Sequence, residues 1–299
     1  MRQIAVIGAS SNIGIRPYDS GELRHIDQAP GVYRELGLVK KIGADDLGDV
    51  TPPPYQDFLR PPGRPRNEQG VAAYSRALAD RVEHATAAGQ FTLVLGGDCS
   101  IVLGSLLGAG RAAGPIGLVY IDAHADFATP EQSRTGSVAS MCLALTVGHG
   151  DSELARLAGN TGLVQPRDVV MIGRRDESEP GYGDEELVQS DILDLPDTGL
   201  WLGDVRSIAA QTLARVARDA LNGFWIHVDS DVLDPRVMPA VDSPEPGGPN
   251  FEQLAALLVP LAAQPRALGL QITLYDPSLD RDRKYGTGMV EMMSSALRG

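Results

Sequence analysis

Residues 122–126, with the sequence Asp-Ala-His-Ala-Asp, constrain the fold of this chain more than any other stretch. They follow residues 117–121, an apolar run that is typical of a buried strand. Asp122, His124 and Asp126 are spaced by two, so on an extended backbone their side chains point to one face. Because buried charges need a partner, the stretch indicates a divalent cation. The alternative is a polar strand end that caps the next helix.

Two other predicted strands also end in polar residues. Residues 224–228 are strand-like, and Asp229 and Asp231 follow on one face. Residues 93–95 are apolar and run into a Gly-Gly turn that is followed by Asp98 and Cys99. Ligands of open parallel sheets bind outside the carboxyl ends of the strands. We therefore expect the three polar strand ends to be neighbours in space.

Strand-like and helix-like segments alternate along the chain. This order predicts an α/β fold, with one parallel sheet covered by helices on both faces, and a single domain over residues 1–299. The Pro- and Arg-rich residues 51–68 predict an exposed loop and not a domain linker. The expected strands are 4–7, 91–95, 116–121, 169–172, 224–228 and 267–274. The expected helices are 31–36, 70–88, 100–107, 138–147, 205–221, 251–261 and 288–297.

Composition narrows the class of partner. The chain has 299 residues, of which 43% are hydrophobic, and a net charge of -13, so we expect a small-molecule partner and neither nucleic acid nor an anionic membrane. Its two cysteines form no disulfide pattern, which indicates a reducing, cytoplasmic location. The first residues read as a strand and not a signal peptide, and no apolar run is long enough to span a membrane. The Gly-rich turn after the first strand lacks the dinucleotide-binding spacing.

The clustered residue types suit a metal centre. Four carboxylates and one imidazole are ligands for Mn²⁺, Mg²⁺ or Zn²⁺, and they exceed what one structural ion requires. A carboxylate-bridged pair of cations would use them all and activate a water for attack on carbon or phosphorus. Cys99 could add a thiolate, which favours Zn²⁺, or it could simply be a small buried apolar residue.

These motifs carry a resemblance to a known family. Residues 122–126 and 229–235 (Asp-Ser-Asp-Val-Leu-Asp-Pro) resemble two signatures of the arginase/agmatinase (ureohydrolase) family, in the same order and spacing. Residues 96–100 (Gly-Gly-Asp-Cys-Ser) resemble a third signature, with Cys99 where the family has a histidine ligand. Residues 238–241 and 247–248 are similar to the segment that follows the second Asp cluster. The resemblance covers roughly residues 70–298.

The resemblance implies a three-layer α/β/α fold around a mainly parallel, eight-stranded sheet and a pair of Mn²⁺ ions. It implies hydrolysis of a guanidinium or amidine group and a homo-oligomer, often a trimer or hexamer. Asp126 would also bind the attacking water and handle its proton. The first ion would be held by Cys99, Asp122, Asp126 and Asp229. The second would be held by Asp122, His124, Asp229 and Asp231.

The departures from the family pattern bear on the substrate. Cys99 resembles the cysteine variant of the hydroxyarginine amidinohydrolase branch, and Zn²⁺ or another divalent metal then becomes an alternative to Mn²⁺. The histidine that assists proton transfer in arginases falls near Ala139, and the guanidinium-binding Glu falls on Leu274. Asp276, two residues on, could replace that Glu, or it could form an Asp-Pro turn. A modified guanidine such as N-hydroxyarginine is therefore expected as the substrate in preference to plain arginine.

The remaining substrate contacts implied by the resemblance are Asp176, Thr135 and Ser137, although Ser178 stands where arginases have a second acid. Two other functions stay open. A single cation held by Asp122, His124 and Asp229 would make a deacetylase-like amide hydrolase. Alternatively, the chain is a non-catalytic relative that keeps the fold. The number of bound metal ions separates the first function from the mononuclear amide hydrolase.

Overall fold

A computed structural model describes residues 2–56, 61, 63–159, 161–176 and 184–298. Ser178 and part of the predicted loop 51–68 lie outside the described residues. No helix in the described part of the chain is both long and apolar enough to cross a bilayer.

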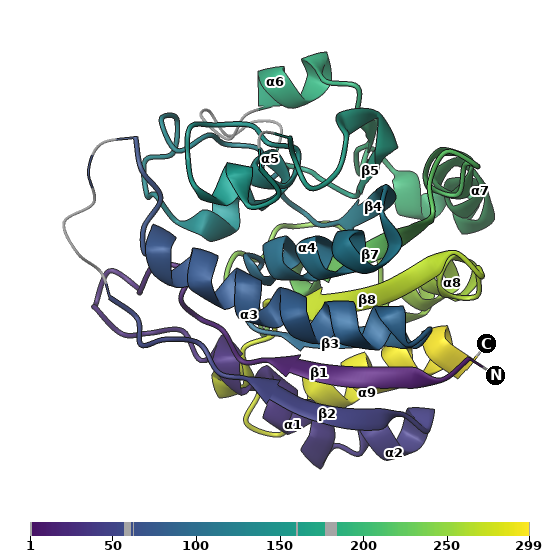
Figure 1. Ribbon diagram of the computed structural model, residues 1–299. Coiled ribbons are helices and arrows are strands. Elements are labelled where there is room, and N and C mark those ends of the chain that lie inside the picture. The colour runs from purple at the N-terminus through teal and green to yellow at the C-terminus, as the bar shows by residue number, and fades with distance from the viewer. Residues whose placement is uncertain (1, 57–60, 62, 160, 177–183, 299) are drawn as a thin grey trace.

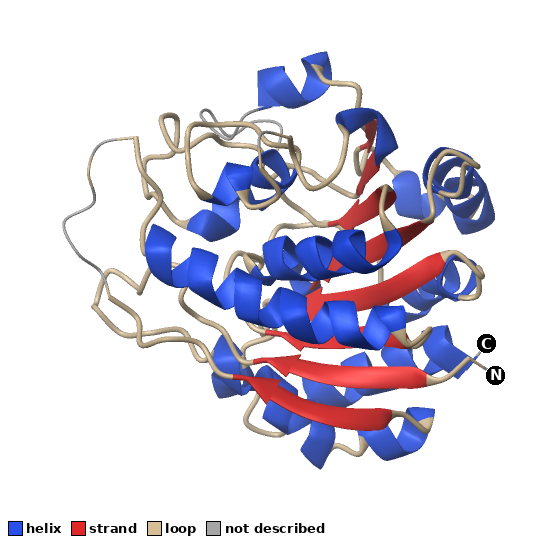
Figure 2. Cartoon of the chain, in the orientation of Figure 1, coloured by secondary structure: helices blue, strands red, loops and turns tan. Residues whose placement is uncertain are grey.

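An eight-stranded, all-parallel sheet forms the centre of the molecule and confirms the predicted fold class. The strand order is β2-β1-β3-β8-β7-β4-β5-β6. Figure 2 shows the strands pointing the same way, toward the side where long loops gather. The strands are β1 Ile4–Ala9, β2 Asp45–Val50, β3 Phe91–Gly96, β4 Ile116–Ile121, β5 Val169–Ile172, β6 Leu193–Leu195, β7 Gly223–Asp229 and β8 Ala267–Thr273.

Helices cover both faces of the sheet. In Figure 1, α3 and α4 lie over one face and α8 and α9 lie over the other, while the two termini lie close together. The helices are α1 Ala29–Glu35, α2 Leu38–Ile42, α3 Glu68–Ala87, α4 Ile101–Ala113, α5 Cys142–Thr146, α6 Asp184–Gln189, α7 Val205–Val216, α8 Phe251–Ala262 and α9 Lys284–Arg298. The helix predicted over 138–147 begins instead as a 3₁₀ turn, Val138–Met141, before α5.

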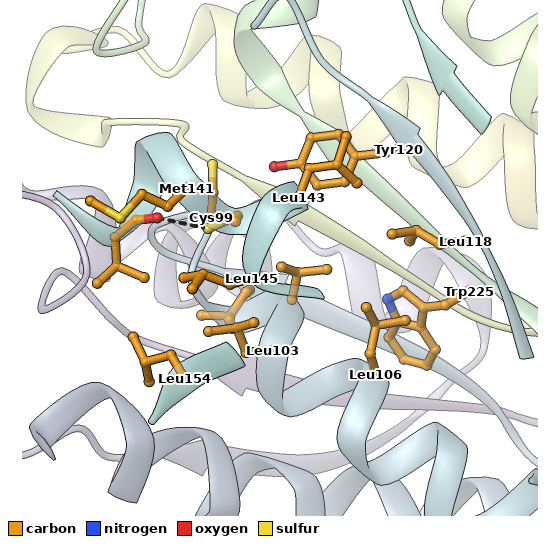
Figure 3. Close-up of a cluster of buried hydrophobic side chains, with 14 of the residues drawn as sticks. Cys99, Leu103, Leu106, Leu118, Tyr120, Met141, Leu143, Leu145, Leu154 and Trp225 are labelled. Carbon is orange, nitrogen blue, oxygen red and sulfur yellow. Dashed lines mark hydrogen bonds between the residues drawn. The ribbon is translucent and has the colours of Figure 1, made fainter. Parts of the chain in front are cut away.

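The sheet separates two apolar cores, as expected for parallel strands that are buried on both sides. Along β4, Leu118 and Tyr120 face the core under α3 and α4, whereas Val119 and Ile121 face the opposite core. Tyr120 and Cys99 belong to the first core, which Figure 3 shows in close-up. This rigid packing fixes the strand ends from which the polar side chains project.

The Gly-Gly turn after β3 is required by close backbone approach. A Cβ atom on Gly97 would lie 1.7 Å from the carbonyl oxygen of Ser11, and one on Gly96 would lie 2.6 Å from that of Ile272. Asp98 then joins the neighbouring loop, because its carboxylate accepts hydrogen bonds from Ser11 Oγ at 2.7 Å and Gly14 N at 3.1 Å. The turn thereby positions Cys99.

Candidate metal centre

A cavity of about 350 Å³ opens at the carboxyl ends of the adjacent strands β3, β8, β7 and β4. The structure brings all six predicted metal ligands to its wall, which is where the strand topology predicted them. The lining residues are Ile15, Arg16, Arg24, Cys99, Asp122, His124, Asp126, Thr135, Ser137, Ala139, Ser140, Asp229, Asp231, Asp242, Ser243, Glu245 and Leu274.

The segment after β4 leaves the sheet in a tight turn. The Asp122 carboxylate accepts a hydrogen bond from the backbone N–H of His124 at 2.8 Å, which turns the chain. Asp126 adopts a left-handed backbone with φ of 48°, a conformation that Asp tolerates better than most residues. Its Oδ2 accepts a hydrogen bond from the Tyr120 hydroxyl at 2.6 Å. These contacts fix the carboxylates of Asp122 and Asp126 at the cavity wall.

The acids after β7 connect to this turn. Asp229 Oδ1 accepts a hydrogen bond from the backbone N–H of Asp231 at 2.9 Å, and Asp231 Oδ1 accepts one from Ala123 N at 3.3 Å. His124 Nδ1 lies 3.0 Å from Asp231 Oδ2 and 3.6 Å from Asp122 Oδ1. One ligand atom from each of Asp122, His124 and Asp231 falls within 4.8 Å of the others, a spacing that suits a shared cation.

Cys99 lies directly beside Asp229. Its Sγ is 2.6 Å from Asp229 Oδ2 and 3.7 Å from the hydroxyl of Thr273. Burial, followed by the negative charge of Asp229, raises the pKa of the Cys99 thiol well above its usual value. The thiol therefore keeps its proton unless a cation replaces it.

The acids form an excess of buried negative charge. Burial and the charge of Asp122 raise the pKa of Asp126 well above its usual value. Burial and the charges of Asp231 and Asp122 do the same for Asp229, and burial with Asp122 raises the pKa of Asp231 to about 6. Burial would also raise the pKa of Asp122, but His124 and His227 lower it to about 2. Such a cluster gains stability from a bound cation.

The environment of one buried carboxylate oxygen indicates that a metal ion fits the clustered carboxylates, imidazole and thiol. Asp122 Oδ2 is shielded from solvent and has no hydrogen-bond partner among the described residues. Asp122 is also common to both groups of ligand atoms that cluster within 4.8 Å. Asp122 would therefore help to hold a bound cation, and the oxygen-rich set with one imidazole and one thiol suits Mn²⁺ or Zn²⁺.

His227 is a member of the site that sequence reasoning did not place there. Its ring lies between Tyr120, with which it stacks at 4.2 Å between centroids, and Asp122, whose Oδ2 lies 3.9 Å from Nε2. His227 precedes Asp229 by two residues on β7, so both side chains point to the same face. That two-residue spacing was the signal that could have identified it.

The predicted substrate contacts divide into two groups. Thr135 and Ser137 line the cavity. The structure does not bring Asp176 and Asp276 to its wall. Asp176 is buried beneath the turn, where its Oδ2 accepts a hydrogen bond from Ala125 N at 2.8 Å. Asp276 accepts hydrogen bonds from Ser278 N at 2.9 Å, from Ser278 Oγ at 2.6 Å and from the backbone N–H of His25 at 3.1 Å.

Other side chains that line the cavity come from loops. Leu274 has a left-handed backbone with φ of 62°, an outlier for this residue type, and its N–H donates to Gly97 O at 2.9 Å. Arg24 pairs with Asp242 and lies over the ring of Tyr18 at 4.2 Å. Glu245 also reaches the cavity. Leu274 was identified from the family resemblance, but no sequence pattern distinguished Arg24, Asp242 and Glu245 from ordinary surface residues.

The fold and site together define an α/β protein with a buried carboxylate cluster, spaced to hold a metal ion, at the carboxyl ends of four adjacent parallel strands. The chain belongs to the arginase family, whose signature matches residues 20–298. It is 30% identical to the arginase of Bacillus caldovelox over 305 residues, covering 99% of this chain and 98% of that protein. The solved structure of that arginase is similar, with a TM-score of 0.85, 27% identity and coverage of 100% and 99%. Arginase from Bacillus subtilis gives a TM-score of 0.86 at 26% identity, with the same coverage.

Proposed function

We propose that this protein is a metal-dependent hydrolase of a guanidino- or amidino-type C–N bond, with two divalent cations, Mn²⁺ or, because of Cys99, Zn²⁺. The buried carboxylate cluster that lines the cavity carries this proposal. One cation would be held by Cys99, Asp122, Asp126 and Asp229, and the other by Asp122, His124, Asp229 and Asp231. When bound, the pair would supply Lewis acidity and an activated water.

Asp126 is the proposed proton acceptor. The Tyr120 hydroxyl holds Asp126 Oδ2 at 2.6 Å, while Oδ1 has no hydrogen-bond partner among the described residues. In the cation-free protein, burial and the charge of Asp122 raise the pKa of Asp126. Its place at the cavity wall puts the carboxylate within reach of a water that enters the cavity. In the proposed reaction, Asp126 takes the proton of the attacking water and passes it to the departing amine.

The cavity favours a weakly basic substrate head. A plain guanidinium is a permanent cation and gains most from a carboxylate close to the reacting carbon. The family position of that carboxylate carries Leu274, which lines the cavity with an apolar side chain. An N-hydroxylated guanidine is less basic because the electron-withdrawing hydroxyl lowers its proton affinity. We therefore propose a modified guanidine such as N-hydroxyarginine in preference to plain arginine.

Glu245 is the proposed contact for a cationic group on the substrate, the role that was expected of Asp276. Its side chain lines the cavity and makes no ion pair with any residue that the structure describes. Thr135 and Ser137 provide polar contacts on the same cavity, although the Ser137 hydroxyl already donates to Gly14 O at 3.2 Å. The Thr135 hydroxyl accepts a hydrogen bond from Ser137 N at 3.2 Å and can still donate one to a substrate, as Glu245 can accept one from a different loop.

The test is a screen for urea and amine release with metal-loaded protein, over matched N-hydroxyguanidino, guanidino and amidino compounds. The proposal predicts the fastest turnover for an N-hydroxyguanidine, and release that is slower by at least about a hundredfold for Asp126→Asn. Glu245→Gln is expected to raise KM for cationic substrates and to leave KM for neutral analogues unchanged. Loaded protein that releases no product from any of these compounds contradicts the proposed activity.

The assembly and the setting belong to the same proposal. Residues 1–299 form a single metallohydrolase domain, which the one continuous sheet supports. The protein is proposed to act in the cytoplasm as a homo-oligomer, a trimer or hexamer, as suggested by its family.

A further inference from the structure

A second imidazole points into the metal centre from β7. His227 is fully buried, and its Nε2 has no hydrogen-bond partner among the described residues. A ring nitrogen of His227 lies within 4.8 Å of ligand atoms from Cys99, Asp122 and Asp229. By proximity alone, His227 is a candidate ligand that would compensate for the cysteine at position 99.

The contact at the other ring nitrogen of His227, Nδ1, indicates a role other than metal binding. His227 Nδ1 lies 2.7 Å from Gln271 Nε2, and β7 and β8 pair these two residues directly. Gln271 Oε1 accepts a hydrogen bond from Trp225 Nε1 at 3.0 Å. All three side chains are fully buried, so no solvent can substitute for these contacts.

The direction of this chain follows from donor chemistry. An indole N–H can only donate, so the oxygen of Gln271 must face Trp225 and the amide nitrogen must face His227. An amide NH₂ also only donates, so Nδ1 of His227 must be the acceptor and carries no proton. The neutral ring then carries its proton on Nε2, the atom that faces the cavity. Rotating the Gln271 amide would set two buried donors against each other at Trp225.

We propose that His227 is a hydrogen-bond donor of the metal centre and not a metal ligand. Its Nε2 lies 3.9 Å from Asp122 Oδ2, a buried oxygen that has no partner among the described residues and that the proposal assigns as the acceptor once the two atoms move within hydrogen-bond distance. The donor would offset the negative charge that Cys99 gains when a bound cation replaces the proton of its thiol. His227 is thus a positioning residue for Asp122, and the Trp225–Gln271 pair sets its tautomer.

The inference rests on the proposed metal site but not on hydrolysis, so it can be tested without a substrate. Protein labelled with ¹⁵N-histidine is examined by NMR with and without ¹¹³Cd²⁺. His124 serves as the internal reference, because its ring nitrogen is expected to couple to cadmium. His227 is expected to remain protonated at Nε2 and to show no coupling.

Gln271→Glu is the decisive variant. A carboxylate can accept from both Trp225 and His227, so it moves the histidine proton to Nδ1 and turns the Nε2 lone pair toward the site. We expect His227 to gain coupling to cadmium in this variant, and Zn²⁺ affinity to rise about tenfold or more. Gln211→Glu, on the exposed face of α7, adds the same charge far from the site and should change neither property.

Trp225→Phe provides a second route if Gln271→Glu fails to fold. Removing the indole N–H frees the Gln271 amide to rotate, so both His227 tautomers should appear in the ¹⁵N spectrum. Coupling of His227 to cadmium in the unmodified protein overturns the inference. A His227 ring that keeps Nε2–H in both variants does so as well. Failure of His124 to couple would instead contradict the proposed metal site.

Discussion

Asp276→Ala separates a structural from a binding role for this acid. The Asp276 carboxylate accepts two hydrogen bonds from Ser278 at the start of the 3₁₀ turn Pro277–Leu279, and one from the backbone N–H of His25. Losing the cap costs about 1 kcal/mol. Leaving the partly buried His25 N–H without its acceptor costs about 1 kcal/mol more. The free energy of unfolding should therefore fall by about 2 kcal/mol.

A loss of about 2 kcal/mol lowers the Tm of a domain of roughly 150–250 residues by about 4 to 8 °C. Because this chain is longer, the decrease should be slightly smaller. Thermal and urea unfolding of the metal-loaded protein measure it. Asp276→Asn is the matched control, because the amide oxygen can still accept from Ser278 and about half of the loss should return. KM values for cationic and neutral substrates should stay equal to those of the unmodified protein. An unchanged Tm with a selective rise in KM for cationic substrates would refute this reasoning.

Three further predictions concern the proposed metal ligands. Asp126→Asn should lower kcat by at least about a hundredfold, as expected for loss of a general base, with the circular dichroism spectrum unchanged; a fully active variant would remove its assigned role. Cys99→His should raise manganese affinity relative to zinc by isothermal titration, since imidazole replaces a thiolate; equal metal content and affinity would exclude Cys99 as a ligand. Burial and the charge of Asp122 raise the pKa of Asp231 to about 6. Below this pH a cation must displace the proton of Asp231, so its binding constant should fall about tenfold per pH unit for each proton displaced. The stability of the cation-free protein has the opposite pH dependence. The contribution of Asp231 to the free energy of unfolding is present at acid pH and is lost as the pH rises through about 6. A pH-independent affinity would show that Asp231 is not a ligand.

The buried interior of the sheet could be predicted because its strands are apolar on both faces. The two edge strands, β2 and β6, could not be predicted in this way. β2 is an acidic segment, Asp45–Val50, whose outward side chains resemble a loop, and β6 has only three residues. Neither segment has the apolar run by which a buried strand is recognised. The eight-stranded sheet was therefore expected from family resemblance, while apolar patterning identified only the six strands away from these two edges.

The grouping of the proposed metal ligands could be predicted where one strand supplies the spacing. Asp229 and Asp231 were grouped correctly at the end of β7, and the same rule applied to His227 would have placed it beside them. The rule fails at Asp276 because β8 ends at Thr273 and the left-handed backbone of Leu274 breaks the alternation of side chains. Glu245 comes from a loop whose path depends on tertiary contacts, such as the hydrogen bond from Arg175 to its carbonyl oxygen.

The most direct test of the account is the number of cations that each chain binds. Purified protein is dialysed against excess Mn²⁺ and, in parallel, Zn²⁺, then freed of loose metal and analysed for metal and protein content. We expect two ions per folded chain, and one or none for Asp229→Ala, since Asp229 is assigned to both positions. One ion per unmodified chain would favour the mononuclear amide hydrolase, and none would contradict the metal centre itself.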